Sequence, residues 1–108
     1  MINAVLKTNE HGDYIGFEVK GHSGSNVSGR DIVCAAVSSI VQTVLIGIDE
    51  VVGVKDTYII DDGYIKCSIP NDLSEAQSLQ IQTLIKTMHL GLGSIAEQYH
   101  NFVRIKED

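Results

Sequence analysis

Cysteine is scarce in this chain of 108 residues, which has only Cys34 and Cys67. Two thiols cannot form a four-thiolate zinc site, and no CxxC pair is present. A disulfide scaffold is not expected either, because Met1-Ile2-Asn3 opens no secretory signal and disulfides belong mainly to exported proteins. We therefore expect at least one free thiol, a cytoplasmic location, and no metal or other cofactor.

Basic charge is also scarce. Eight Lys and Arg stand against fourteen Asp and Glu, giving a formal net charge of −6. Only Arg30 and Arg104 offer guanidinium groups, so direct binding of nucleic acid is not expected and a basic protein or peptide is the easier partner. We see no apolar run of the roughly 18–20 residues that a membrane span needs. The 44% hydrophobic content and the length predict one folded domain over residues 1–108.

Hydrophobic periodicity predicts the order ββαββαβ. Residues 2–7 and 15–20 alternate as two strands of a hairpin, and residues 55–60 and 64–69 form a second hairpin around Asp61-Asp62-Gly63. A helix is expected from Asp31 to about Val52, apolar on more than one side, so that a sheet covers one side and a second helix or another subunit covers the other. Gly53 is the expected stop.

The last part of the sequence predicts a second helix and a fifth strand. Ser74 and Gln77 have the spacing of a capping box, which predicts a second helix from that point. Residues 102–105 read as a short closing strand. The fold class is therefore α+β, two layers, with an antiparallel or mixed sheet packed against two long helices.

Cys34 is the first candidate for chemistry. If Asp31 is the N-cap of the first helix, Cys34 lies in the first helical turn, where the positive end of the dipole favours a thiolate. His22 precedes it by twelve positions across a glycine-rich segment, and Cys with His is the usual pair of nucleophile and base. The alternative is that Cys34 is a small core residue, since free cysteines are often buried.

The other candidates have simpler explanations. Cys67 belongs to the inward face of its strand and is expected to be inert. Ser38 lies one turn after Cys34 and can either contribute to the site or bond back to a helix carbonyl. His11, His89 and His100 match no metal signature. The glycines at 21, 24 and 29 match no phosphate-binding template and are expected to be hinge points of a mobile loop.

A contiguous motif makes a family resemblance visible. The segments that carry it are Gly21-His22-Ser23-Gly24 and Gly29-Arg30-Asp31-Ile32-Val33-Cys34-Ala35-Ala36-Val37-Ser38. They closely resemble the ribosomal-processing cysteine proteases called Prp, and the order of hairpins and helices is also similar, so the resemblance covers essentially the whole chain.

The resemblance implies a reaction and its residues. It implies that Cys34 is the nucleophile, that His22 is its general base and acid, and that the enzyme removes a short N-terminal extension from a large-subunit ribosomal protein. It also implies a homodimer. We expect Gly21, Gly29, Asp31 and Ser38 to support the site. The expected substrate loop comprises Ser23, Gly24, Ser25, Asn26, Val27, Ser28 and Arg30.

The expected mechanism is acyl transfer, with backbone N–H groups at the helix start, including that of Cys34, stabilising the oxyanion. Two other functions stay open at this point. The chain could be a non-catalytic ribosome-assembly module that binds the same basic protein. It could instead be a redox-sensing thiol protein in which His22 tunes Cys34, although Cys67 is expected to face the core and so offers no resolving partner.

Overall fold

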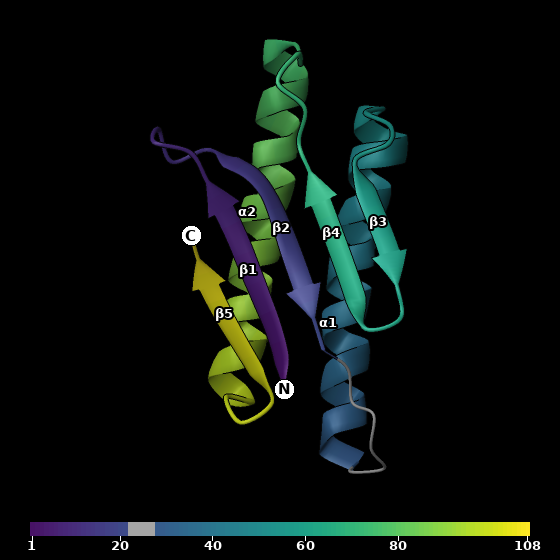
Figure 1. Ribbon diagram of the computed structural model, residues 1–108, viewed down its shortest axis with the longest axis vertical. Helices are drawn as coiled ribbons and strands as arrows, with labels where there is room; N and C mark the ends of the chain where they lie inside the picture. Colours follow the sequence, from purple (N-terminus) through teal and green to yellow (C-terminus); the bar gives the residue numbers. More distant parts are fainter. Residues whose placement is uncertain (22–27) are drawn as a thin grey trace.

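In the described part of the chain, five strands form one mixed sheet, and two long helices cover one of its faces (Figure 1). The computed structural model describes residues 1–21 and 28–108, with side chains described for 1–21 and 32–108. The elements are β1 (Ile2–Thr8), β2 (Tyr14–Lys20), α1 (Ser28–Ile46), η1 (Gly47–Val52), β3 (Tyr58–Asp61), β4 (Tyr64–Ser68), α2 (Glu75–Gln98) and β5 (Val103–Glu107). The predicted order and the two-layer α+β class are confirmed.

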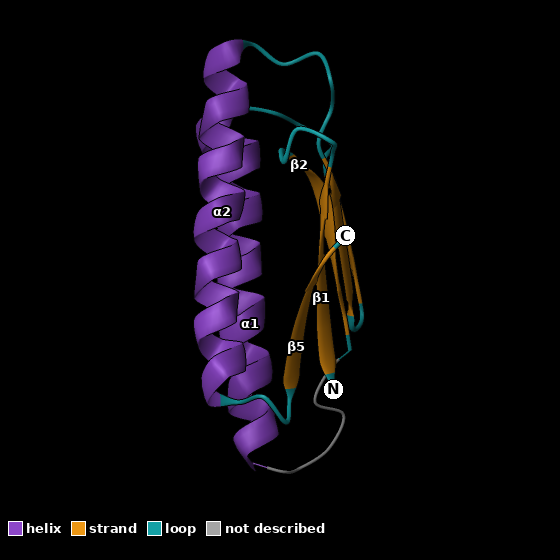
Figure 2. Ribbon diagram, turned by 90° about the vertical axis from the view of Figure 1, so that its left-hand side faces the viewer, coloured by secondary structure: helices purple, strands orange, loops and turns teal. Residues whose placement is uncertain are grey.

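The sheet has the order β3-β4-β2-β1-β5, antiparallel except for the parallel pair of β1 with β5. Figure 2 shows both helices on one face of the sheet and no helix of the described residues over the other face, and Figure 1 shows the helices side by side. Alternate strand residues point at the helices because strand side chains alternate between faces. The buried ones include Ile2, Ala4, Leu6, Phe17, Val19, Ile65, Cys67 and Val103.

The first helix begins earlier than expected. It starts at Ser28, so Asp31 lies inside its first turns and is not the N-cap. Its end agrees with the prediction: the helical run continues through the π-helical segment η1 to Val52, and Gly53 ends it with a left-handed φ of 83°. Both helices meet the sheet with apolar residues, and α2 begins with the predicted capping box at Ser74 and Gln77.

One predicted strand is shifted. Residues 55–57 do not belong to β3, because Asp56 takes a φ of 59° that interrupts an extended chain just before Tyr58. Lys55 instead turns back to the end of the first helical run, where its ammonium group lies 3.1 Å from Asp49 Oδ1 and donates to the Asp49 carbonyl at 2.9 Å. This contact ties the exit of η1 to the start of the second hairpin.

The far end of the first hairpin is held by a glutamine from α2. The register of β1 and β2 shifts between Lys7 and Thr8, and there the Tyr14 N–H donates to Gln82 Oε1 at 2.7 Å. Gln82 Nε2 donates to the Tyr14 carbonyl at 2.8 Å, so the side-chain amide satisfies both backbone groups as a neighbouring strand would. The Tyr14 hydroxyl also bonds to His89 Nδ1 at 2.8 Å. These contacts fix the sheet on α2.

The segment Ile32–Val52 is long and apolar enough to cross a membrane by length and composition alone, with a mean hydropathy of 1.9. The expectation that no run reaches that length was therefore wrong. The core helix of a soluble protein passes the same test. This segment supplies Val33, Val37, Val41, Val44, Leu45 and Ile48 to the hydrophobic core, which accounts for much of its apolar character.

Candidate active site

Cys34 lies in a pocket of about 250 Å³ between α1, the end of β2 and the turn that joins β3 to β4. Cys34 is half-buried. Ser38 and Gln42 line the same pocket, because residues four apart share one face of a helix. Cys34 packs against the hydrophobic core and also lines this pocket, so the alternative of a core residue holds only for part of its surface.

Gly21 forms the wall opposite α1 and is held there by two constraints. Its N–H donates to the Gly63 carbonyl at 2.9 Å, which joins the end of β2 to the β3–β4 turn. Its φ is 105°, and a Cβ at this position would collide with the carbonyl group of Met1. Only glycine meets both conditions. The expectation that Gly21 supports the site thus has a physical basis, although the constraint makes it an anchor and not a hinge.

The described lining of the pocket is acidic. Asp61 and Asp62 lie at its mouth, and no Lys or Arg is among the described residues that line it. Tyr64 also borders the pocket, but its hydroxyl donates to Glu18 Oε1 at 3.0 Å. This hydrogen bond lowers the pKa of Glu18, and burial raises the pKa of Tyr64. Tyr64 is therefore neutral near pH 7, and the described residues that line the pocket include no positive partner for a Cys34 thiolate.

The earlier helix start changes two expectations for Cys34. As the seventh residue of α1, it lies beyond the first turn, where the effect of the helix dipole is concentrated. Only the first four N–H groups of a helix lack intrahelical partners, so the Cys34 N–H belongs to the helical ladder and is not a free oxyanion donor. Both predictions took Asp31 as the N-cap, which starts the helix at Ile32, four residues after its observed start at Ser28, and they were wrong for that reason.

The structure brings three of the proposed site residues together and leaves others undescribed. Gly21, Cys34 and Ser38 share the pocket. His22 and the loop residues 23–27 lie outside the described residues. Ser28, Gly29 and Arg30 belong to α1 and not to the loop in which they were expected, and their side chains, with that of Asp31, also lie outside the described part.

Gln42, Asp61 and Asp62 were missed by the sequence analysis. The spacing of four residues from Cys34 to Ser38 and on to Gln42 was a usable signal, because it places all three on one helix face. Nothing local pointed to the two aspartates, which were interpreted only as turn residues.

Cys67 behaves as expected. It is 2% exposed, and burial raises the pKa of its thiol to about 11, with Thr57 acting weakly in the opposite direction. Neither cysteine forms a disulfide in the described structure. Among the described residues, no group of three or more His, Cys, Asp or Glu could hold a metal ion.

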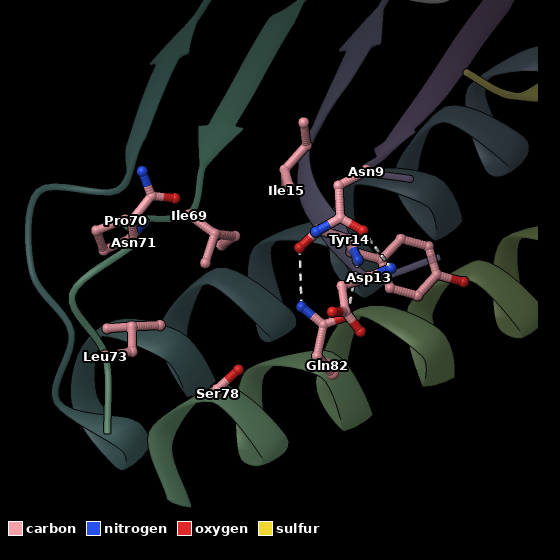
Figure 3. Close-up of a pocket in the computed structure, with 10 residues that line it drawn as sticks. All are labelled: Asn9, Asp13, Tyr14, Ile15, Ile69, Pro70, Asn71, Leu73, Ser78 and Gln82. Carbon is pink, nitrogen blue, oxygen red and sulfur yellow. Dashed lines mark hydrogen bonds between the residues drawn. The ribbon is translucent and has the colours of Figure 1, made fainter. Parts of the chain in front are cut away.

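A second pocket lies at the opposite end of the sheet, between the first hairpin and α2 (Figure 3). It has a volume of about 150 Å³ and is lined by Asn9, Asp13, Ser78 and Gln82 among others. Gln82 already bonds to Tyr14 on both of its amide atoms, as the dashed lines in Figure 3 show in part. This pocket contains no thiol, so we place the chemistry at Cys34.

The family model described as Cysteine protease Prp matches residues 1–104. The chain belongs to the Prp family of cysteine proteases. A ribosomal processing cysteine protease Prp from Bacillus subtilis is 27% identical over 111 residues, covering 97% of this chain and 96% of the relative.

Solved structures agree on the fold. A Streptococcus mutans protein matches with a TM-score of 0.86 at 29% identity, over 99% of this chain and 93% of that one. A Prp from S. aureus, solved with a substrate peptide, matches with a TM-score of 0.86 at 22% identity over the whole of both chains. The resemblance seen in the sequence is therefore confirmed, and the chain is a Prp-type peptide hydrolase.

Replacing Gly21 tests its role as an anchor. We expect Gly21→Ala to lower the free energy of unfolding well beyond the roughly 1–2 kcal/mol that a left-handed residue costs an alanine, since the Cβ also collides with Met1. Gly12→Ala is the matched control, because Gly12 has a φ of 83° and nothing within 4 Å of an added Cβ. Urea unfolding of both variants measures the difference. Equal losses would remove the steric part of the argument.

The two thiols should differ in alkylation. At pH 7–8 we expect iodoacetamide to modify Cys34 in the folded protein and to leave Cys67 unmodified, because the thiolate is the reactive form and the pKa of Cys67 is raised to about 11. The Cys67 reaction should appear as the pH rises toward 11, or on unfolding. Mass spectrometry of the wild type, Cys34→Ala and Cys67→Ala resolves the sites. Rapid labelling of Cys67 in folded protein at pH 7 would contradict its placement.

Proposed function

We propose that this Prp-family protein removes the short N-terminal extension of the large-subunit ribosomal protein L-twenty-seven, with Cys34 as nucleophile and His22 as general base and acid. The observation that carries the proposal is the position of Cys34 in an open pocket whose opposite wall is Gly21, the residue directly before His22. The relative from Bacillus subtilis is named a ribosomal processing protease, and the S. aureus enzyme has been solved with a substrate peptide and with a covalently linked product peptide.

The charges around the pocket make His22 necessary to this mechanism. Asp61 and Asp62 oppose a negative sulfur, and the helix dipole acts mainly within the first turn, before Cys34. A protonated imidazole at His22 supplies the positive partner that the described lining lacks. The Cys34 proton passes to His22, and the resulting ion pair stores the thiolate until a peptide enters.

The reaction then proceeds by acyl transfer. The Cys34 sulfur attacks the scissile carbonyl carbon, and the carbonyl oxygen becomes an oxyanion. The Gln42 carboxamide and the Ser38 hydroxyl are the side-chain donors on the Cys34 face of α1, and one well-placed donor contributes roughly 10²–10³ in rate. His22 gives its proton to the leaving amine as the C–N bond breaks. Water, deprotonated by His22, hydrolyses the thioester and frees Cys34.

The acidic pocket mouth suits a basic ribosomal protein. Asp61 and Asp62 are part of the net charge of −6, and this negative charge raises the rate of encounter with a positively charged partner. Two cysteines without a disulfide fit the reducing cytoplasm, where we place the enzyme.

Cleavage of the ribosomal protein tests the assignment. We expect Cys34→Ala to bind the substrate but to cleave none, and His22→Ala to lose most of the activity, while Cys67→Ala cleaves at close to the wild-type rate. Mass analysis of the products after incubation with the purified substrate measures all three. Undiminished cleavage by Cys34→Ala would end the proposal. Binding by the wild type without any cleavage would instead favour the assembly module.

We also propose that the enzyme is a homodimer that pairs through the exposed groove between α1 and α2. Two hollows of about 360 and 370 Å³ follow this groove, and they are lined mainly by apolar groups. The hydroxyls of Thr43, Thr83 and Thr87 each donate to the carbonyl four residues earlier, at 2.6–2.8 Å, so their hydrogen-bonding capacity is used within their own helices. Val51 and Leu79 at its end are 82% and 69% exposed. An apolar surface of this kind is typical of a protein contact.

A charge placed in this groove should separate the subunits. We expect Thr43→Arg to sediment as a monomer at concentrations where the wild type is a dimer, because an unpaired buried charge is costly. Asn3→Arg, on the uncovered face of the sheet, is the control and should leave the dimer intact. A wild type that is monomeric throughout, or a Thr43→Arg dimer, would contradict the proposal.

A further inference from the structure

The edge strand β3 carries a single charged residue, Asp61, at its end. It pairs with β4 on one side only, and all four of its residues are exposed. Ile59 and Ile60 are 62% and 49% exposed. Edge strands usually carry charges or proline that prevent pairing with another chain. The opposite edge follows this rule, because β5 exposes Arg104, Lys106 and Glu107.

The unpaired backbone groups of β3 can be assigned. The Ser68 N–H donates to the Thr57 carbonyl at 2.7 Å, so Thr57 turns toward β4. In an antiparallel pair, alternate residues bond to the same neighbour. Tyr58 and Ile60 therefore turn their N–H and C=O groups away from β4, where no strand of the described structure meets them.

This free edge leads directly to Cys34. Ile60, Asp61 and Asp62 at the end of β3 line the pocket that contains the thiol. A chain added alongside β3 would therefore continue into the pocket in an extended conformation. The two aspartates at that point would face its side chains and favour a lysine or arginine there.

We infer that the substrate binds by β-strand addition to β3: an extended peptide pairs with Tyr58 and Ile60 through its backbone and presents a basic side chain to Asp61 and Asp62 as its scissile bond reaches Cys34. This inference rests on the proposed function and adds the mode of binding and the preference for a basic residue. Backbone pairing supplies affinity that depends little on sequence, and the aspartates supply the selectivity.

N-methylation of the peptide backbone tests the pairing. The probe is a synthetic peptide that spans the cleavage site of the ribosomal protein, made as a series in which one amide at a time is N-methylated. Binding to Cys34→Ala is measured by fluorescence anisotropy, so no cleavage is needed. We expect Kd to rise roughly five- to tenfold at every second residue beside β3, since alternate amides face the strand and each bond contributes about 1 kcal/mol. A series without this alternation overturns the inference.

A matched pair of variants tests the protein side. Tyr58→Pro removes the outward N–H without removing a bond to β4, and proline is tolerated on edge strands. Tyr58→Val also removes the aromatic ring but keeps the N–H. In the Cys34→Ala background, we expect Tyr58→Pro to weaken peptide binding roughly five- to tenfold relative to Tyr58→Val. Equal affinities overturn the inference, provided that thermal unfolding shows both variants folded.

Two further outcomes separate this inference from the other proposals. If the wild type cleaves the peptide but neither test shows an effect, the protease assignment holds and strand addition is wrong. If Tyr58→Pro dissociates a dimer that Tyr58→Val preserves, β3 pairs with a second copy of the chain, which also overturns the inference.

Substitution of lysine by glutamate in the peptide should raise Kd for the wild-type site and should do so less for Asp61→Asn/Asp62→Asn.

Discussion

The hydrogen bond from Gly21 to Gly63, together with the close approach of Gly21 to Met1, is the constraint on which the site depends. It fixes the end of β2 against the β3–β4 turn, and these two segments form the side of the pocket that faces Cys34. Because Gly21 directly precedes His22, the same constraint sets the point from which the chain leaves the sheet before the proposed general base. A larger residue at position 21 would disturb the sheet edge and the site together.

The rest of the fold keeps the two sides of this pocket at a constant separation. Buried residues of α1 and α2 pack on one face of the sheet, and Gln82 of α2 bonds to both backbone groups of Tyr14 at the far end. The helix that carries Cys34 is thus held along its length, while the pocket itself stays open. Rigid support beneath an accessible thiol is what nucleophilic catalysis needs, since the reacting atoms must be positioned before the substrate arrives.

The charges at the pocket have two separate effects, on the attraction of a substrate and on the activation of the Cys34 thiol. The aspartates at the mouth favour a basic substrate but oppose a thiolate, and the described lining offers no basic group that compensates. In our proposal His22 stabilises the thiolate, because its imidazole accepts the thiol proton and then becomes the positive partner of the sulfur. The same aspartates stand at the end of β3, the edge strand proposed to pair with the substrate, so attraction and backbone pairing act at adjacent points.

Most of the fold could be predicted because its signals are local. Alternation in β1 and β2, the capping box at Ser74 and the stop at Gly53 each depend on residues a few positions apart. The start of α1 could not be placed this way, since Asp31 is a good cap by type and yet lies within the helix. Residues 55–57 were misplaced for a similar reason: their composition permits a strand, and the left-handed Asp56 excludes it.

The sequence by itself determined the family, the order of elements and the pairing of Cys34 with Ser38, because a contiguous motif and helical spacing are properties of neighbouring residues. Only the tertiary structure decided what surrounds the thiol. Asp61 and Asp62 reach Cys34 from more than 25 positions away, and Gly21 is fixed by Gly63 and Met1. Such contacts follow from the strand order of the sheet, which brings together segments that are distant in the sequence. The local sequence of each segment does not indicate which other segment it will contact.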